Sequence, residues 1–106
     1  MNLGKSIRTL RKSLTPKVTQ AEYAESIGIT QSYLSCIENG EKEPSTALLK
    51  TIGEKHDTPM PVLLWISMDE SDVHDNKKES FRILKPAMDA LLNDLFFTKI
   101  QEVKNG

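Results

Sequence analysis

Two short helical patterns separated by a glycine are the feature that most constrains this chain of 106 residues. They occupy residues 19–40, TQAEYAESIGITQSYLSCIENG, where apolar residues recur at helical spacing. Gly28 stands between the two patterns and allows the positive φ that a sharp turn between helices needs. The sequence therefore predicts helices at about 19–27 and 30–38, joined by a tight turn.

Residues that suit helix ends bracket both predicted helices. Thr19 and Glu22 have the spacing of a capping box, in which each side chain accepts a hydrogen bond from the backbone of the other residue. Thr30 can cap the second helix, and Asn39-Gly40 can end it. The inward faces of the two helices then carry the following apolar residues: Tyr23, Ala24, Ile27, Leu34 and Ile37.

The outward face of the second predicted helix is polar. Opposite the apolar positions it carries small or amide-bearing side chains: Gln31, Ser32, Ser35 and Cys36. Groups of this kind read base edges in the major groove of DNA. The pattern therefore indicates a protein that reads DNA, and these four residues are its predicted base-reading set.

Residues 5–68 resemble the helix-turn-helix domain of the Cro and lambda-repressor-like family, also called the Xre family. Counted from Gln20, the family pattern has a small fifth residue, a glycine at the ninth, and aliphatic residues at the eighth, tenth, fifteenth and eighteenth positions. This chain supplies the matching residues: Ala24, Gly28, Ile27, Ile29, Leu34 and Ile37. The resemblance implies an all-α domain of five helices, and it does not extend to the C-terminal part.

Helix signals place the other elements of this domain, which is predicted to span residues 1–68. A first helix is expected at about 3–13, and a fourth at 46–55 behind a serine cap. A short fifth helix is expected after Thr58, with Pro59 at its first position, where a missing N–H costs little. The predicted core of these helices comprises Leu3, Ile7, Leu10, Leu48, Leu49, Ile52, Val62, Leu63, Trp65 and Ile66.

A polar, charged segment at residues 69–80 follows the domain and is predicted to be a hinge. Beyond it, residues 81–106 contain an apolar stripe at helical spacing, and an amphipathic helix is expected from Pro86 to about residue 104. An exposed apolar stripe marks a contact surface. The predicted dimer or partner surface comprises Met88, Leu91, Leu92, Leu95, Phe96 and Ile100.

Gln31 is the leading candidate for a base contact because it lies in the first turn of the reading helix. A glutamine there can bond N6 and N7 of adenine together, which is worth about 1–3 kcal/mol of discrimination. Cys36 can contact a thymine methyl group or be an inert small residue. Nothing in the sequence indicates the perturbed thiol that a redox switch needs.

Side chains around the reading helix are candidates to hold the DNA backbone. The resemblance implies that Gln20 and the start of its helix bind a phosphate oxygen, assisted by the helix dipole. Tyr33 is left open between a phosphate contact and inward packing. The further phosphate candidates are basic or amide residues of the first helix and of the end of the third: Arg8, Lys12, Asn39 and Lys42.

Arg11 and Glu38 match a pair that forms a partly buried ion pair between the first and third helices of the resembled family. The resemblance therefore implies a structural role for both residues. Removing one partner would leave the other charge buried and unpaired.

The formal net charge of the chain is −1, but the charge is unevenly distributed. Residues 1–17 carry five Lys or Arg and no acid, whereas residues 57–106 carry six Lys or Arg against nine Asp or Glu. Phosphate binding depends on where the positive charge lies rather than on the total. We therefore expect the basic end to approach DNA and the acidic half to face away from it.

Several function classes are disfavoured by the composition. No nucleophile–base pair, glycine-rich phosphate loop or metal-ligand spacing is present, so we expect no enzyme activity, no cofactor and no metal site. No run reaches the roughly 18 apolar residues of a membrane helix. The single cysteine fits a reducing compartment, and no signal peptide is recognisable, so a cytoplasmic location in a bacterium or phage-infected cell is expected.

The sequence thus predicts a sequence-specific transcription regulator, most readily a repressor, that binds double-stranded DNA at an inverted repeat as a homodimer. The C-terminal helix of this regulator would pair with a second copy or bind a protein antagonist. One alternative is an antitoxin that represses its own operon and binds a toxin through its C-terminal helix. The other is a protein-interaction module that keeps the fold but does not read DNA. The basic first helix argues against that module, which has no need of positive charge beside the reading face.

Overall fold

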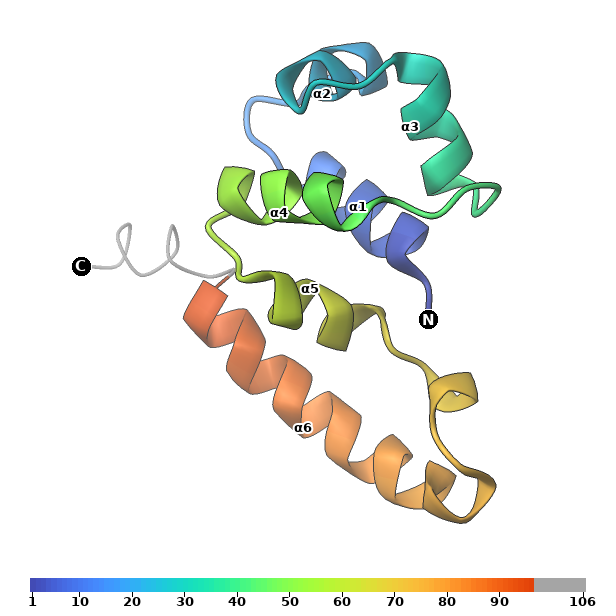
Figure 1. The fold of residues 1–106 in the computed structure, drawn as a ribbon. Helices are drawn as coiled ribbons and strands as arrows, with labels where there is room; N and C mark the ends of the chain where they lie inside the picture. Colours follow the sequence, from blue (N-terminus) through green and yellow to red (C-terminus); the bar gives the residue numbers. More distant parts are fainter. Residues whose placement is uncertain (97–106) are drawn as a thin grey trace, which may run out of the picture. The chain divides into compact units, whose positions relative to one another are not determined.

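The computed structural model describes residues 1–96, and in this range every regular element is helical (Figure 1). The α-helices are α1 (Leu3–Lys12), α2 (Gln20–Ser26), α3 (Gln31–Glu38), α4 (Thr46–Lys55), α5 (Met60–Ser67) and α6 (Lys78–Phe96). Two short 3-10 helices, η1 (Glu70–Asp72) and η2 (Asp75–Lys77), precede α6. The predicted all-α fold is confirmed. The chain divides into two compact units, Met1–Ser67 and the part from Met68 onward.

Local capping fixes the α2–turn–α3 pair as the sequence predicts. The amide of Glu22 donates to Thr19 Oγ1 over 3.1 Å, and the amide of Thr19 donates to Glu22 Oε1 over 2.9 Å. Thr30 caps α3 by accepting from the Tyr33 amide. Gly28 adopts φ 78° in the turn, a region that L side chains rarely enter.

The core of the first unit joins α1 to α3 and α5, α2 to α3, and α4 to α5. Its buried apolar residues are Ile7, Leu10, Tyr23, Ala24, Ile27, Leu34, Ile37, Leu48, Leu49, Ile52 and Leu63. The closest approach is at Gly4, where an added Cβ atom would lie 2.1 Å from the carbonyl oxygen of Ile37. The start of α1 therefore rests directly against the end of α3.

The fifth helix begins differently from the prediction. Thr58 is buried and its hydroxyl donates to the carbonyl of His56, so it does not cap α5. The carbonyl of Pro59 instead accepts the first amide hydrogen bonds, and α5 starts at Met60. The tight end of α4 causes this shift, because the Thr58 amide bonds back to the carbonyl of Gly53 over 2.8 Å.

In α1 and α5, fewer of the predicted core residues are buried than the sequence analysis expected. In α5 the only buried apolar residue is Leu63, whereas Val62, Trp65 and Ile66 are half-buried. In α1, Leu3 is likewise half-buried. An eight-residue helix presents only about one face to its neighbours, so a continuous apolar run cannot all be buried by the first unit.

The C-terminal helix starts earlier than predicted, at Lys78 rather than Pro86, so the proline lies inside α6. Contacts with the preceding segment hold its first turns: Lys78 Nζ lies 3.2 Å from Asp75 Oδ1, and Arg82 pairs with Glu70. The polar segment 69–80 thus contains η1, η2 and the first residues of α6. Its action as a hinge stays a prediction.

Across residues 1–96, no helix combines the length and the apolar character that crossing a bilayer requires.

Candidate DNA-binding site

The predicted base-reading residues lie on one side of α3, opposite its buried anchors. Leu34 and Ile37 are 0% and 1% exposed and fix the inner face of the helix. Gln31 and Ser32 are exposed in its first turn, directly after the capping residue Thr30. Ser35 and Cys36 follow one turn later and are half-buried. We call these four outward residues the reading strip. Its contact with bases stays a prediction.

Tyr33 and Lys42 come together beside the reading strip. The ammonium of Lys42 lies 5.9 Å from the centroid of the Tyr33 ring, within the range of a cation–π contact. Tyr33 is half-buried. Lys42 is exposed and contacts the ring, and the acidic residues Glu41 and Glu43 flank it in the sequence.

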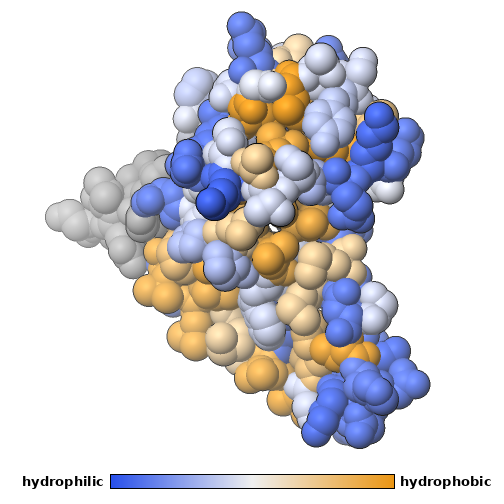
Figure 2. Space-filling view, viewed as in Figure 1, coloured by the Kyte–Doolittle hydropathy of each residue, from blue (hydrophilic) through white to orange (hydrophobic). Residues whose placement is uncertain are grey.

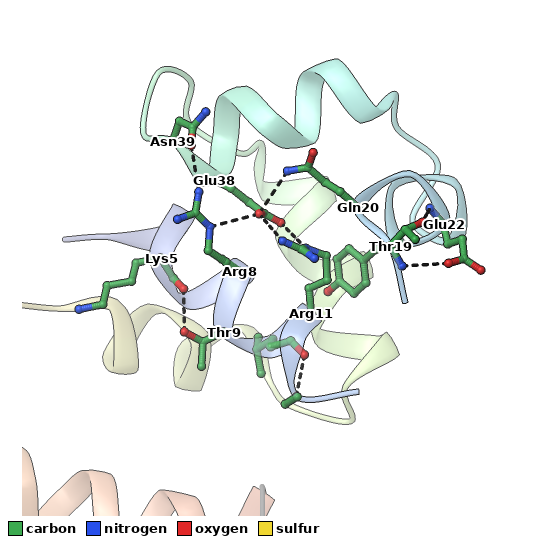
Figure 3. Close-up of polar contacts among 12 residues, drawn as sticks. Lys5, Arg8, Thr9, Arg11, Thr19, Gln20, Glu22, Glu38 and Asn39 are labelled. Atoms are coloured by element: carbon green, nitrogen blue, oxygen red, sulfur yellow. Dashed lines mark hydrogen bonds and ion pairs between the residues drawn. The ribbon is translucent and has the colours of Figure 1, made fainter. Parts of the chain in front are cut away.

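The carboxylate of Glu38, on α3, is the centre of the site, and side chains from α1 and α2 converge on it (Figure 3). Its side chain is 0% exposed. Arg11 donates to both carboxylate oxygens, from Nε to Oε2 and from Nη2 to Oε1, each over 2.8 Å. Gln20 Nε2 from α2 and Arg8 Nε from α1 donate to Oε1 over 3.3 and 3.4 Å. The Arg11–Glu38 ion pair named from the sequence is therefore present. It is part of a larger cluster that also includes Gln20 and Arg8.

These contacts keep Glu38 ionised although it is buried. Burial alone raises the pKa of a carboxyl group, but here the hydrogen bonds and charge of Arg11, with the bonds from Gln20 and Arg8, outweigh it. The net result is a lowered pKa of Glu38. The hydrogen bonds that Arg11 donates to Glu38 correspondingly raise the pKa of Arg11. The site is therefore a desolvated but compensated charge cluster.

Three residues predicted as phosphate ligands are engaged within the protein. Gln20 and Arg8 both donate to Glu38, and Arg8 Nη2 also donates to Asn39 Oδ1 over 2.9 Å. Sequence reasoning missed this convergence, because a helical pattern does not show which side chains of three helices meet. Of the other phosphate candidates, Lys12 and Lys42 are exposed, and Lys42 lies over the ring of Tyr33.

The predicted C-terminal surface divides into two parts on α6, a helix in which none of the residues is buried. Leu91 and Leu95 are 59% and 62% exposed, whereas Met88, Leu92 and Phe96 are half-buried. Ile100 lies outside the described residues. Ile83 and Leu84 are also exposed, and the prediction missed them because it began the helix at Pro86. Hydrophobic residues accordingly gather at the surface in the region of α6 (Figure 2).

His56 is held by a protein contact. Its Nε2 lies 2.7 Å from the hydroxyl of the buried Tyr23, which joins the end of α4 to α2. Burial, with the nearby charge of Lys55, lowers the pKa of His56, whereas burial raises that of Tyr23. Within the described part of the chain, no group of three or more His, Cys, Asp or Glu residues could hold a metal ion.

The geometry defines a helix-turn-helix protein with an exposed reading helix, and comparison with known proteins agrees. A family model described as helix-turn-helix matches residues 7–63, more than half of the chain. The chain therefore belongs to this helix-turn-helix family of DNA-binding regulators, and the predicted Xre-type resemblance is confirmed. The family fold is that of a regulator rather than an enzyme.

One curated relative carries a functional name. Over 53 residues the chain is 43% identical to a protein named Antitoxin PezA from Streptococcus pneumoniae serotype 4. The match covers 50% of this chain and 32% of the relative, so the chain spans about a third of that protein's length. No solved structure gives a significant match.

Proposed function

We propose that this chain is a sequence-specific transcription regulator, acting as a repressor in a bacterial or phage-infected cytoplasm, that binds an inverted-repeat operator as a homodimer. The observation that carries the proposal is the reading strip on α3, outward-facing on a helix whose other face is fixed by Leu34, Ile37 and Glu38. A rigid helix presents hydrogen-bonding groups to base edges at a defined position. Membership of the helix-turn-helix family supports this use.

Each part of the site has a distinct role in this proposal. Gln31 and its neighbours in the reading strip read bases from the first turns of α3. The exposed Lys12 and Lys42, with the start of α2, hold the phosphates on either side. No Lys or Arg lies on α3 itself, so discrimination rests on neutral groups and affinity on the flanking elements.

The homodimer follows from how little one short reading helix can contact. Two copies whose α3 helices lie about 34 Å apart reach successive major-groove faces of one duplex. The exposed apolar side of α6, with Leu84, Leu91 and Leu95, is the proposed pairing surface. A dimer of this kind requires an operator of matching two-fold symmetry.

Selection of bound sites from random duplex DNA tests the proposal. We expect an inverted repeat whose half-sites are about 10–10.5 base pairs apart, or a multiple of this spacing. Gln31→Ala should then lower affinity for the selected site by about 10–100-fold while sparing non-specific binding. Thr51→Ala, an exposed substitution on α4, is the matched control and should leave binding unchanged. Weak binding that is indifferent to sequence and to Gln31→Ala would instead support the interaction module.

A second candidate function is an autoregulating antitoxin whose C-terminal segment binds a toxin. The name of the curated relative and the exposed apolar residues of α6 favour it. Co-expression with the protein encoded by the adjacent gene tests this candidate. A stoichiometric complex, lost in Leu91→Arg and retained in Asn93→Arg, would support the antitoxin. A homodimer that ignores the neighbour protein would support the simple repressor.

A further inference from the structure

The side-chain amide of Asn39 is held in one orientation by α1. Asn39 follows the last residue of α3 as its C-terminal cap and is exposed. Its Oδ1 accepts a hydrogen bond from Arg8 Nη2 over 2.9 Å, and Figure 3 shows the amide nitrogen on the side away from that bond. The outward group of Asn39 is therefore the NH2 group, which only donates.

The same guanidinium is itself anchored to a buried group. Arg8 Nε lies 3.4 Å from Oε1 of Glu38, and the side chain of Arg8 is 42% exposed. The fork of Arg8 thus spans from the carboxylate of Glu38 to the amide oxygen of Asn39. Turning the amide by 180° would place two donors, the NH2 group and the guanidinium, against each other. Arg8 therefore fixes which end of the amide faces outward.

We infer that Arg8 is a positioning residue that turns the NH2 group of Asn39 toward a phosphodiester oxygen of bound DNA. This inference rests on the proposed function. A phosphodiester oxygen only accepts hydrogen bonds, so an amide that presents its oxygen would gain nothing there. Arg8 acts through Asn39 and is not itself the phosphate ligand, which differs from the sequence-based assignment of Arg8.

The test is a double-mutant cycle of DNA affinity in the full chain, with the duplex recovered by site selection. Arg8→Met and Asn39→Ala should each weaken binding by about tenfold, the scale of one hydrogen bond to a charged acceptor. The double variant should be no weaker than Asn39→Ala alone. Effects that multiply in the double variant would overturn the inference, because they would mean that the two residues act independently.

Arg8→Lys separates the planar fork from the positive charge. Lysine keeps the charge but loses the planar fork that bridges two acceptors. We therefore expect Arg8→Lys to weaken binding about as much as Arg8→Met, with an unchanged salt slope. Near-normal affinity for Arg8→Lys, or a slope reduced by about 0.9 in Arg8→Met, would identify Arg8 as a direct phosphate contact and overturn the inference.

Lys12→Met is the matched control for loss of charge from α1. Lys12 is exposed on the same helix, so this variant should reduce the salt slope, and its effect should multiply with that of Asn39→Ala. Amide NMR gives a direct readout: the Asn39 NH2 signals should shift on DNA binding in the wild type and not in Arg8→Lys. The same shift in both proteins would overturn the inference. Sequence-independent binding by the wild type would be a failure of the proposed function itself.

Discussion

Arg11 donates to both oxygens of the Glu38 carboxylate, and the Glu38 side chain is fully shielded from solvent. This pair joins α1 to the last residue of the reading helix. Because the carboxylate is desolvated, losing one of its partners should cost more stability than losing one partner of a surface ion pair.

Arg11→Met should destabilise the domain by about 3–5 kcal/mol, the usual cost of leaving one member of a buried pair without its partner. Urea denaturation measures this change. Glu54→Gln, at an exposed position of α4, is the control and should change stability by less than about 0.5 kcal/mol. A loss for Arg11→Met as small as the control's would show that Glu38 is satisfied by its other donors.

Acid should unfold the protein partly through Glu38. Its pKa in the folded protein lies below the ordinary value of 4.5, so its contribution to stability is present above pH 4.5 and is lost as pH falls through the folded value. We expect Glu38→Gln to be less stable at neutral pH and to lose less stability on acidification than the wild type. Denaturation curves between about pH 3 and 7 would contradict this if the two proteins showed the same slope.

His56 should add a second, milder pH dependence. Its pKa is lowered from 6.5 in the folded protein, so neutral His56 favours folding above that pH, and the contribution is lost as pH falls toward the folded value. NMR titration of the imidazole should give a pKa below 6.5. His56→Gln should remove this step from the stability profile below pH 6.5, and a titration at or above 6.5 would rule it out.

Gly4→Ala should destabilise the protein by about 1–3 kcal/mol, because the new methyl group meets the backbone of Ile37 and neither element can move freely. Gly28→Ala is the informative comparison. Its added Cβ meets nothing within 4 Å, so its cost, about 1 kcal/mol, comes from the positive φ alone. Thermal unfolding of both variants tests the distinction, and a neutral Gly4→Ala would mean that α1 can move away from α3.

Leu91→Arg should convert the proposed dimer into a monomer. A charged side chain at the centre of an apolar interface is costly to desolvate, and the monomer should bind its operator at least tenfold more weakly. Analytical ultracentrifugation measures the assembly state. Asn93→Arg, at an exposed polar position of the same helix, should leave it unchanged. A Leu91→Arg protein that sediments like the wild type would remove α6 from the pairing surface.

The helix pair around the turn was predictable because its signals are local. Thr19 and Glu22, three residues apart in the sequence, form the two hydrogen bonds of the capping box. Gly28 adopts the positive φ that the turn between the two helices requires. The start of α6 was not predictable in this way. A proline normally opens a helix, and only the contacts of Lys78 and Arg82 with the preceding segment show that this helix begins before Pro86.

The contacts of the candidate site were predictable only in part. The pairing of Arg11 with Glu38 came from family resemblance, whereas the addition of Gln20, Arg8 and Asn39 depends on where three helices cross. Spacing within one helix carries no information on such a crossing. Residues assigned to DNA from sequence can therefore be engaged within the protein, as Gln20 and Arg8 are.

The carboxylate of Glu38, shared by several donors, holds α3 from its inner side and leaves its outer side free to vary. Because the inner side of α3 is secured by Glu38 and two aliphatic anchors, we expect exchanges at the exposed Gln31 and Ser32 to change stability little. If the reading strip contacts bases as proposed, new operator preferences can arise by exchanging its outward residues on an unchanged scaffold. We expect differences in operator specificity to accumulate at these outward positions, while the buried Glu38, Leu34 and Ile37 are retained.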